Sequence, residues 1–237
     1  MLTVGERVAE LDWAGVRDNL DADGYALSKA VLSSAECASI NRLYDSPETD
    51  FRSRIDMARY NFGKGEYKYF DYPLPETVNG LRDALYPPLA EIANTWSTKL
   101  GTDVRWPGTL SAFIDQCHAA GQLRPTPLIL RYGEGDYNCL HQDLYGDVYF
   151  PLQVVCMLSE PAHDFDGGEL VLVEQRPRMQ SRPMVLSLAQ GDIAIIPVRE
   201  RPRQGTRGFH RVQMRHGVSV LRRGHRATLG IIFHDAR

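Results

Sequence analysis

The sequence predicts an α+β fold, with N-terminal helices packed on a C-terminal antiparallel β-sandwich or barrel. Apolar residues in the first half recur at helical spacing, whereas the chain after Pro127 consists of short β-rich runs separated by Gly, Pro and Asp. These seven or eight runs have no helix between them, as in an antiparallel sheet protein. The 237 residues, 43% of them hydrophobic, suffice for one core. We therefore expect one domain over 1–237, with a helical support region containing short strands at 1–126 and a β core at 127–237.

The first third of the chain predicts two short helices around a strand. Residues 11–22 favour an amphipathic helix that ends near Gly24, and 24–33 favour a strand. Ser34 is a suitable N-cap for a helix that begins at Ala35. Residues 51–73 are rich in aromatic side chains and are interrupted by two glycines, which indicates a hairpin or a long loop.

The middle of the chain has a helical pattern from about 76 to 100, and we expect Pro87 and Pro88 to divide it. A further helix is expected at about 109–117. The strands expected after Pro127 are LILRY, DVYFPLQVVCML, GELVLVEQ, PMVLSL, DIAIIP, HGVSVL and ATLGIIF.

Charge and cysteine content narrow the function classes. The formal net charge is -3, yet residues 174–237 contain 13 Arg, no Lys and four acidic residues. Guanidinium groups bind carboxylate or phosphate, so this segment is an anion-binding surface or else a solvated basic face. No apolar run approaches the ~20 residues that span a bilayer, and the N-terminus is too charged for a signal peptide, so we expect a cytoplasmic protein without membrane contact. The cysteines contain no CxxC pair and are expected to be mostly reduced, buried residues: Cys37, Cys117, Cys139 and Cys156.

A metal-ligand pattern lies in the β half. His141 and Asp143 are two residues apart, so in extended backbone their side chains project from the same face. His216, at the head of HGVSVL, is the candidate for a third ligand. Two histidines and a carboxylate form the facial triad of non-haem Fe(II) oxygenases, which leaves positions for oxygen and a bidentate co-substrate. The alternative is that His141 and Asp143 form only a structural hydrogen bond at the end of a strand. His118, His163, His210, His225 and His234 show no second ligand spacing and are expected to be structural.

A candidate anion site follows the third ligand. HGVSVL and HRATLGIIF are expected to form a hairpin, with Gly224 at the left-handed position of its loop. This register places His216 and Arg226 on one face, with Thr228 beside them. A guanidinium inside a sandwich needs an anionic partner, and the free carboxylate of an iron-chelating 2-oxo acid is one. The alternative is a solvated Arg at a strand edge.

These residues resemble the Fe(II)- and 2-oxoglutarate-dependent dioxygenases of double-stranded β-helix (jelly-roll) fold. The resemblance covers about 127–235, including RYGEGDYNCLHQD, FDGGELVLVE and AQGDIAIIP. It implies that His141, Asp143 and His216 bind Fe(II) and that Arg226 binds the distal carboxylate of 2-oxoglutarate. Thr228 and Tyr132 are further candidates for the co-substrate. The implied reaction consumes O2, hydroxylates a substrate C–H bond and releases succinate and CO2.

The stretches HQDLYGDVYFPLQ and EQRPRMQS are similar to those of a bacterial group described as oxidative demethylases of damaged nucleic acid, related to the AlkB enzymes. The AlkB pattern has a second Arg six residues after the carboxylate-binding one, where this chain has Ile232. The ten residues from His216 to Arg226 are nearer to the prolyl hydroxylase pattern. Three hypotheses therefore remain. They are a demethylase that contacts nucleic acid through the Arg-rich segment 174–215, an amino-acid or prolyl hydroxylase, and a jelly-roll binding module without catalysis.

Overall fold

The computed structural model describes residues 2–176 and 178–237. Its helices are α1 (Val4–Ala9), α2 (Trp13–Ala22), α3 (Ser34–Leu43), the 3-10 turn η1 (Met57–Tyr60), α4 (Glu76–Lys99) and α5 (Leu110–Ala119). Its first strands are β1 (Ala26–Ser28), β2 (Phe51–Asp56), β3 (Gly63–Lys64) and β4 (Glu66–Phe70). The later strands are β5 (Leu128–Tyr132), β6 (Tyr137–His141), β7 (Leu152–Met157), β8 (Phe165–Gly167), β9 (Leu170–Gln175), β10 (Arg182–Leu186), β11 (Ile193–Pro197), β12 (Glu200–Gly205), β13 (Gly208–Val218), β14 (Leu221–Gly224) and β15 (Arg226–Ile231).

Two antiparallel sheets form the body of the molecule. The larger has seven strands in the order β1-β11-β7-β15-β5-β4-β2, and the smaller has the order β10-β9-β13-β6-β3 with β12 added beside β13. Strands far apart in sequence are neighbours, as in a jelly roll. The α+β jelly-roll prediction is therefore confirmed. Strands β1 to β4 show that the first 126 residues also contribute to both sheets.

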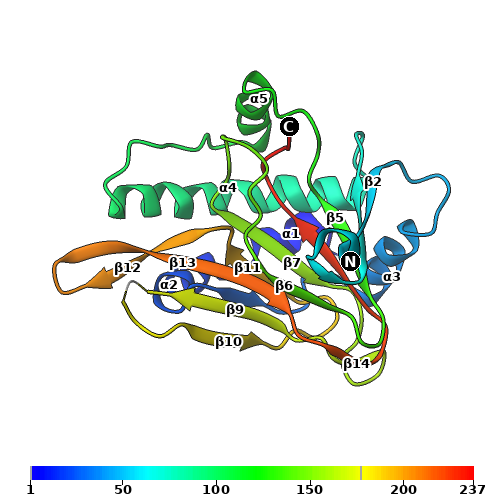
Figure 1. Cartoon of the computed structure of the whole chain (residues 1–237). Helices are drawn as coiled ribbons and strands as arrows, with labels where there is room; N and C mark the ends of the chain where they lie inside the picture. The colour runs from blue at the N-terminus through cyan, green and yellow to red at the C-terminus, as the bar shows by residue number, and fades with distance from the viewer. Residues whose placement is uncertain (1, 177) are drawn as a thin grey trace.

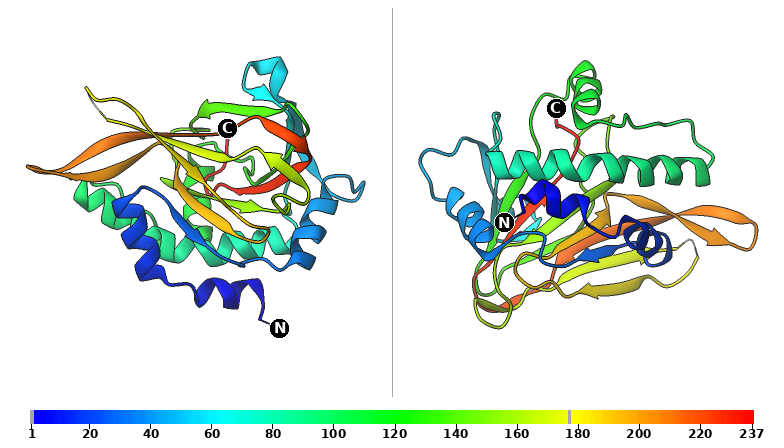
Figure 2. Two further views of the ribbon diagram at one scale, coloured as in Figure 1. Left: turned by 90° about the horizontal axis from the view of Figure 1, so that it is seen from below. Right: turned by 180° about the vertical axis from the view of Figure 1, so that it is seen from behind.

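The helices cover the outer face of the seven-stranded sheet. Figure 1 and the left view of Figure 2 show α4 running along the sheets, with α1 and α2 on the same side. Leu85, Leu89 and Trp96 of α4 belong to one buried cluster with Val154 of β7 and Leu229 of β15. A second cluster fills part of the space between the sheets. None of the described helices is long and apolar enough to cross a membrane.

Helix α4 corrects one prediction. Pro87 and Pro88 lie inside a single helix of 24 residues and do not divide it. Each proline removes one backbone donor, but Leu85, Tyr86 and Leu89 around them are fully buried. Packing of this face outweighs the local preference. The following helix begins after Thr109, as expected, and α3 has Ser33 rather than Ser34 as its N-cap.

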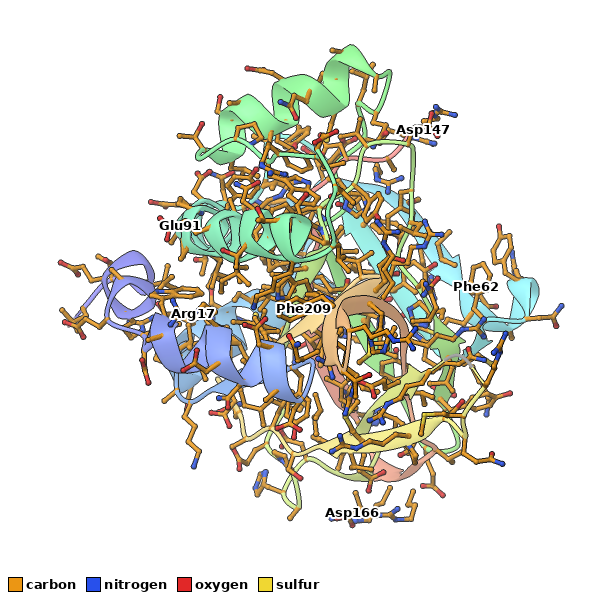
Figure 3. All side chains as sticks on the ribbon, turned by 90° about the vertical axis from the view of Figure 1, so that its left-hand side faces the viewer. Arg17, Phe62, Glu91, Asp147, Asp166 and Phe209 are labelled. Atoms are coloured by element: carbon orange, nitrogen blue, oxygen red, sulfur yellow. The ribbon has the colours of Figure 1, made fainter. Side chains whose placement is uncertain are left out.

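The expected hairpin at 51–73 is present as β2 and β4, and η1 and β3 lie between these strands. Strand β4 pairs with β5 in the larger sheet, whereas β3 pairs with β6 in the smaller one. This segment therefore joins the two sheets at one end of the sandwich. Figure 3 shows Phe62, between η1 and β3, at the outer edge of the molecule.

The expected hairpin between HGVSVL and HRATLGIIF is wrong. Strand β13 lies in the smaller sheet and β15 in the larger one, and β14 between them pairs with β8. The segment therefore crosses from one sheet to the other. Gly224 does adopt the left-handed conformation expected of it, with φ +80°, but at the end of β14 instead of in a tight loop.

Candidate active site

A cavity of about 420 Å³ lies between the two sheets and contains every predicted site residue. The smaller sheet contributes His141 and His216, and the larger sheet contributes Tyr132, Arg226 and Thr228. His216 and Arg226 thus share a cavity, but they face it from opposite sheets and do not lie on one face of a hairpin, as was expected.

The two histidines are cross-strand partners. His141 at the end of β6 pairs with His216 of β13, and the register of β13 shifts directly after His216. Their ring centroids are 4.2 Å apart. The Nδ1 atom of His141 lies 2.8 Å from the carbonyl oxygen of Cys139. If Nδ1 carries the proton it donates to that carbonyl, which leaves the Nε2 lone pair directed at the cavity.

Asp143 lies between the two rings, two residues beyond the end of β6. Its Oδ2 is 3.2 Å from His216 Nε2 and its Oδ1 is 3.5 Å from His141 Nε2. The three residues each offer a ligand atom within 4.8 Å of the others, which is close enough for one metal ion to contact all three. No other group of three such side chains occurs among the described residues.

Electrostatics at this cluster suit a cation. Burial alone would raise the pKa of Asp143, but the two neighbouring histidines and hydrogen bonds from His216 and Tyr145 hold it well below its ordinary value. Burial, and then the charge of His216, lower the pKa of His141. Asp143 is therefore ionised and His141 neutral near pH 7, the protonation states that metal ligands require.

Arg226 is the second distinctive feature of the cavity. Its side chain is 1% exposed, and Nε and both Nη atoms have no hydrogen-bond partner. The centroid of the Tyr132 ring lies 5.5 Å from the Cζ atom of Arg226. Burial lowers the pKa of Arg226. A buried guanidinium without a partner is costly unless an anion pairs with it, so the residues present fit a ligand with a carboxylate.

Tyr132 and Thr228 lie beside Arg226. Tyr132 pairs with Arg226 across β5 and β15, and Thr228 follows two residues later on the same side of β15. The Tyr132 hydroxyl accepts a hydrogen bond from Asn138 Nδ2 at 3.4 Å, which leaves its own hydrogen for a ligand. Burial raises its pKa to about 12, so Tyr132 is protonated near pH 7.

The Arg-rich segment 174–215 is only partly a surface, which corrects the expectation that it forms an anion-binding surface or a solvated basic face throughout. Glu174 and Arg201 are fully buried and 2.6 Å apart. Arg176 and Arg203 also bind Glu174, at 2.6 and 2.8 Å. Register brings these residues together, because β9 and β12 both pair with β13. Three of the arginines therefore neutralise one buried carboxylate. Those that remain exposed are Arg178, Arg182, Arg199, Arg207, Arg211 and Arg215.

The structure brings further residues to the site that sequence reasoning missed. Tyr145 donates a hydrogen bond to Asp143 Oδ1 at 2.7 Å, and Tyr69 of β4 donates to the Tyr145 hydroxyl at 2.9 Å. Gln153 Nε2 lies 3.4 Å from His216 Nε2. Tyr145 follows Asp143 by two residues, and this spacing is the sequence feature that could have indicated its place at the site. No sequence feature near Asp143 indicated Tyr69, which lies 76 residues before Tyr145.

The other histidines and the cysteines lie outside the metal cluster. All four cysteines are free. Cys139 is exposed at the cavity instead of packed in a core, whereas the others are buried. His118 pairs with Asp235 at 3.0 Å. His234 is fully buried, and burial lowers its pKa to about 4.

Comparisons with known proteins identify the family of the chain. Residues 65–236 match the family Oxygenase-NA, described as "Oxygenase, catalysing oxidative methylation of damaged DNA". Two Mycobacterium tuberculosis proteins, Uncharacterized protein MT2286 and Uncharacterized protein Rv2227, are each 50% identical over 167 residues, which is 70% of this chain and 72% of theirs.

Solved structures share the fold at low identity. An oxidoreductase of the 2OG-Fe(II) oxygenase family from Burkholderia pseudomallei aligns with a TM-score of 0.56 at 16% identity, over 96% of this chain and 94% of its own. A Pseudomonas putida prolyl-4-hydroxylase aligns with a TM-score of 0.51 at 17% identity, over 95% and 99%. The chain therefore belongs to the Oxygenase-NA family, a family of oxygenases, and it shares the fold of these 2-oxoglutarate/Fe(II) enzymes.

Proposed function

We propose that His141, Asp143 and His216 hold Fe(II) and that Arg226 binds the distal carboxylate of 2-oxoglutarate. The observation that carries this proposal is Arg226, which lines the same cavity as the cluster and whose three guanidinium nitrogens have no hydrogen-bond partner. A jelly-roll binding module would have no use for a buried, unpartnered cation beside a metal-ligand triad. Iron and 2-oxoglutarate, when bound, supply with O2 the hydroxylation of a substrate C–H bond, and succinate and CO2 are released.

The protein groups bind and orient the reactants. The hydrogen bond between His141 Nδ1 and the Cys139 carbonyl fixes the ring so that Nε2 faces the cavity. Arg226 offers a planar fork for a carboxylate. Tyr132, which pairs with Arg226 across the strands, and Thr228, two residues further along β15, would donate hydroxyl hydrogens to the same carboxylate. The sheets on both sides exclude water from this end of the cavity.

For the substrate, we propose the N-methyl group of an alkylated nucleobase, as in the AlkB-related group. Hydroxylation there yields an alcohol that collapses to formaldehyde and the bare nitrogen. The description of the family supports this choice. So does the lining of the cavity, in which Asp143 and Arg226 are the only carboxylate and guanidinium among the described residues. Once metal and co-substrate engage them, no charged partner remains for the ammonium and carboxylate of a free amino acid.

The cavity and its mouth suit a planar, largely apolar group. Tyr67, Leu128 and Leu130 line the interior. Phe62 lines the cavity and stacks on Tyr60 at 5.5 Å with an interplanar angle of 21°, and both rings are about half exposed. Exposed aromatic rings stack on unpaired bases in many proteins that bind single strands. The exposed arginines of segment 174–215 would contact the phosphates.

The test is a substrate panel. The purified protein with Fe(II) and 2-oxoglutarate should release succinate and formaldehyde with N-methylated single-stranded oligonucleotides, and neither product above background with unmodified ones. Binding to the oligonucleotides should weaken with salt, with a slope of roughly -0.7 per phosphate contact. Succinate release with a prolyl peptide and not with methylated oligonucleotides would instead support the hydroxylase suggested by the ten-residue spacing between His216 and Arg226.

A further inference from the structure

The carboxylate of Asp143 is held by a chain of two tyrosines. Tyr145 donates its hydroxyl hydrogen to Asp143 Oδ1 at 2.7 Å, and Tyr69 donates to the Tyr145 oxygen at 2.9 Å. A phenol has one hydrogen to donate. The order of the chain is therefore fixed, with Tyr69 donating to Tyr145 and Tyr145 donating to Asp143.

The far end of this chain is anchored in the larger sheet. Tyr69 is 6% exposed and pairs with Leu128 across β4 and β5. The guanidinium carbon of Arg52 lies 4.2 Å from the centroid of the Tyr69 ring, and Arg52 Nε donates to the Pro125 carbonyl at 2.7 Å. The rings of Tyr69 and Tyr145 meet edge to face at 6.1 Å. Tyr69 is thus fixed by contacts that do not involve the metal ligands.

Asp143 itself lacks such support from the backbone. Strand β6 ends at His141, and the next strand begins at Leu152. Rotation of the carboxylate is therefore set by side chains. Oδ1 accepts the Tyr145 hydrogen bond, while Oδ2 faces His216 at 3.2 Å. With Oδ1 occupied, Oδ2 is the oxygen left for a metal.

We propose that Tyr145 and Tyr69 are positioning residues for the metal centre. Tyr145 fixes the carboxylate so that one oxygen binds the ion, and Tyr69 acts only by holding Tyr145. This inference rests on the proposed function, in which Asp143 is a metal ligand. Hydrogen bonds to ligating side chains typically change metal affinity 10- to 100-fold.

The first test is metal binding without turnover. Tyr145→Phe removes one oxygen and keeps the ring. The full-length variant should bind Co(II) 10- to 100-fold more weakly by titration calorimetry, and its Co(II) ligand-field spectrum should change. Tyr86→Phe is the matched control, because Tyr86 is a fully buried tyrosine outside the cavity whose hydroxyl has no hydrogen-bond partner, and it should leave Co(II) affinity unchanged. Wild-type affinity and an unaltered spectrum in Tyr145→Phe would overturn the proposal.

The second test is a double-mutant cycle. Tyr69→Phe should weaken Co(II) binding less than Tyr145→Phe, and the double variant should be no weaker than Tyr145→Phe alone. Additive losses would overturn the chain from Tyr69 through Tyr145. If Tyr145→Phe does not fold, Co(II) binding by Tyr69→Phe is the test. Wild-type Co(II) affinity in Tyr69→Phe would refute the role of Tyr69. Asp143→Ala distinguishes a failure of this inference from a failure of the proposed function, because wild-type Co(II) affinity in that variant would refute the metal site itself.

Discussion

Arg226 and Arg201 are both fully buried arginines, but only Arg201 has a carboxylate partner. Substitution by Met should therefore change the free energy of unfolding in opposite directions. Arg201→Met leaves a buried network incomplete, which typically costs about 3–5 kcal/mol. Arg226→Met removes an unpaired buried charge and fills the space with a similar apolar chain. We expect the unliganded variant to gain about 1–3 kcal/mol.

Ligand binding should change in the other sense. Loss of a buried charged pair with the distal carboxylate costs about 3–5 kcal/mol, which weakens 2-oxoglutarate binding by roughly two to four orders of magnitude. At a concentration of 100 Kd the ligand stabilises the wild type by about 2.7 kcal/mol. In Arg226→Met the same concentration should add less than about 0.5 kcal/mol.

The assay is urea unfolding with Mn(II) in place of Fe(II), with and without 2-oxoglutarate. Arg201→Met serves as the comparison, because it should lower the free energy of unfolding and still be stabilised by 2-oxoglutarate as much as the wild type is. A full 2-oxoglutarate increment in Arg226→Met would refute the anion site. A loss of stability in unliganded Arg226→Met as large as that in Arg201→Met would show that Arg226 has a structural partner.

Three further predictions test other parts of the molecule. His216→Ala should keep the fold by circular dichroism but lose most Co(II) affinity, and 2-oxoglutarate turnover in this variant would contradict its role as third ligand. His234 has a pKa of about 4 when folded and about 6.5 when unfolded, so its contribution to stability is complete above pH 6.5 and is lost as the pH falls toward 4. Between pH 7 and pH 5 the wild type should lose about 2 kcal/mol more of its free energy of unfolding than His234→Phe does, as measured by urea unfolding. Equal losses in the two proteins would refute this. Gly224→Ala should destabilise more than Gly121→Ala, because both have φ near +80° but only at Gly224 would a Cβ meet backbone, that of Asp164; equal losses in thermal melts would contradict the steric argument.

The sequence was sufficient to predict what depends on local periodicity. Alternation and turn residues predicted the fold class, and the two-residue spacing of His141 and Asp143 predicted a shared side. The prediction that α4 is divided at Pro87 was wrong, because burial of Leu85 and Leu89 outweighs the tendency of the prolines to break the helix. That burial depends in part on β7 and β15, which lie more than sixty positions later in the chain.

The errors at the site have the same origin. The turn before Arg226 resembles a hairpin locally, but β14 pairs with β8, more than fifty residues earlier. The Arg-rich segment was expected to be a surface, whereas three of its arginines bind the buried Glu174 once β9 and β12 both pair with β13. Contacts of this kind are set by sheet order, and no local pattern encodes them.

The crossover at β14 also explains how one cavity serves a metal and a co-substrate. Because the chain changes sheets between His216 and Arg226, the triad and the guanidinium face each other across a sandwich whose sheets pack about 10 Å apart. A hairpin would have placed both on one wall. A ligand that reaches both walls needs a chelating group at one end and an anion at the other, which a 2-oxo dicarboxylic acid provides. In the proposed site, a 2-oxo acid with a single carboxylate would leave Arg226 without a partner, so the placement of the two groups on opposite sheets would favour a dicarboxylate.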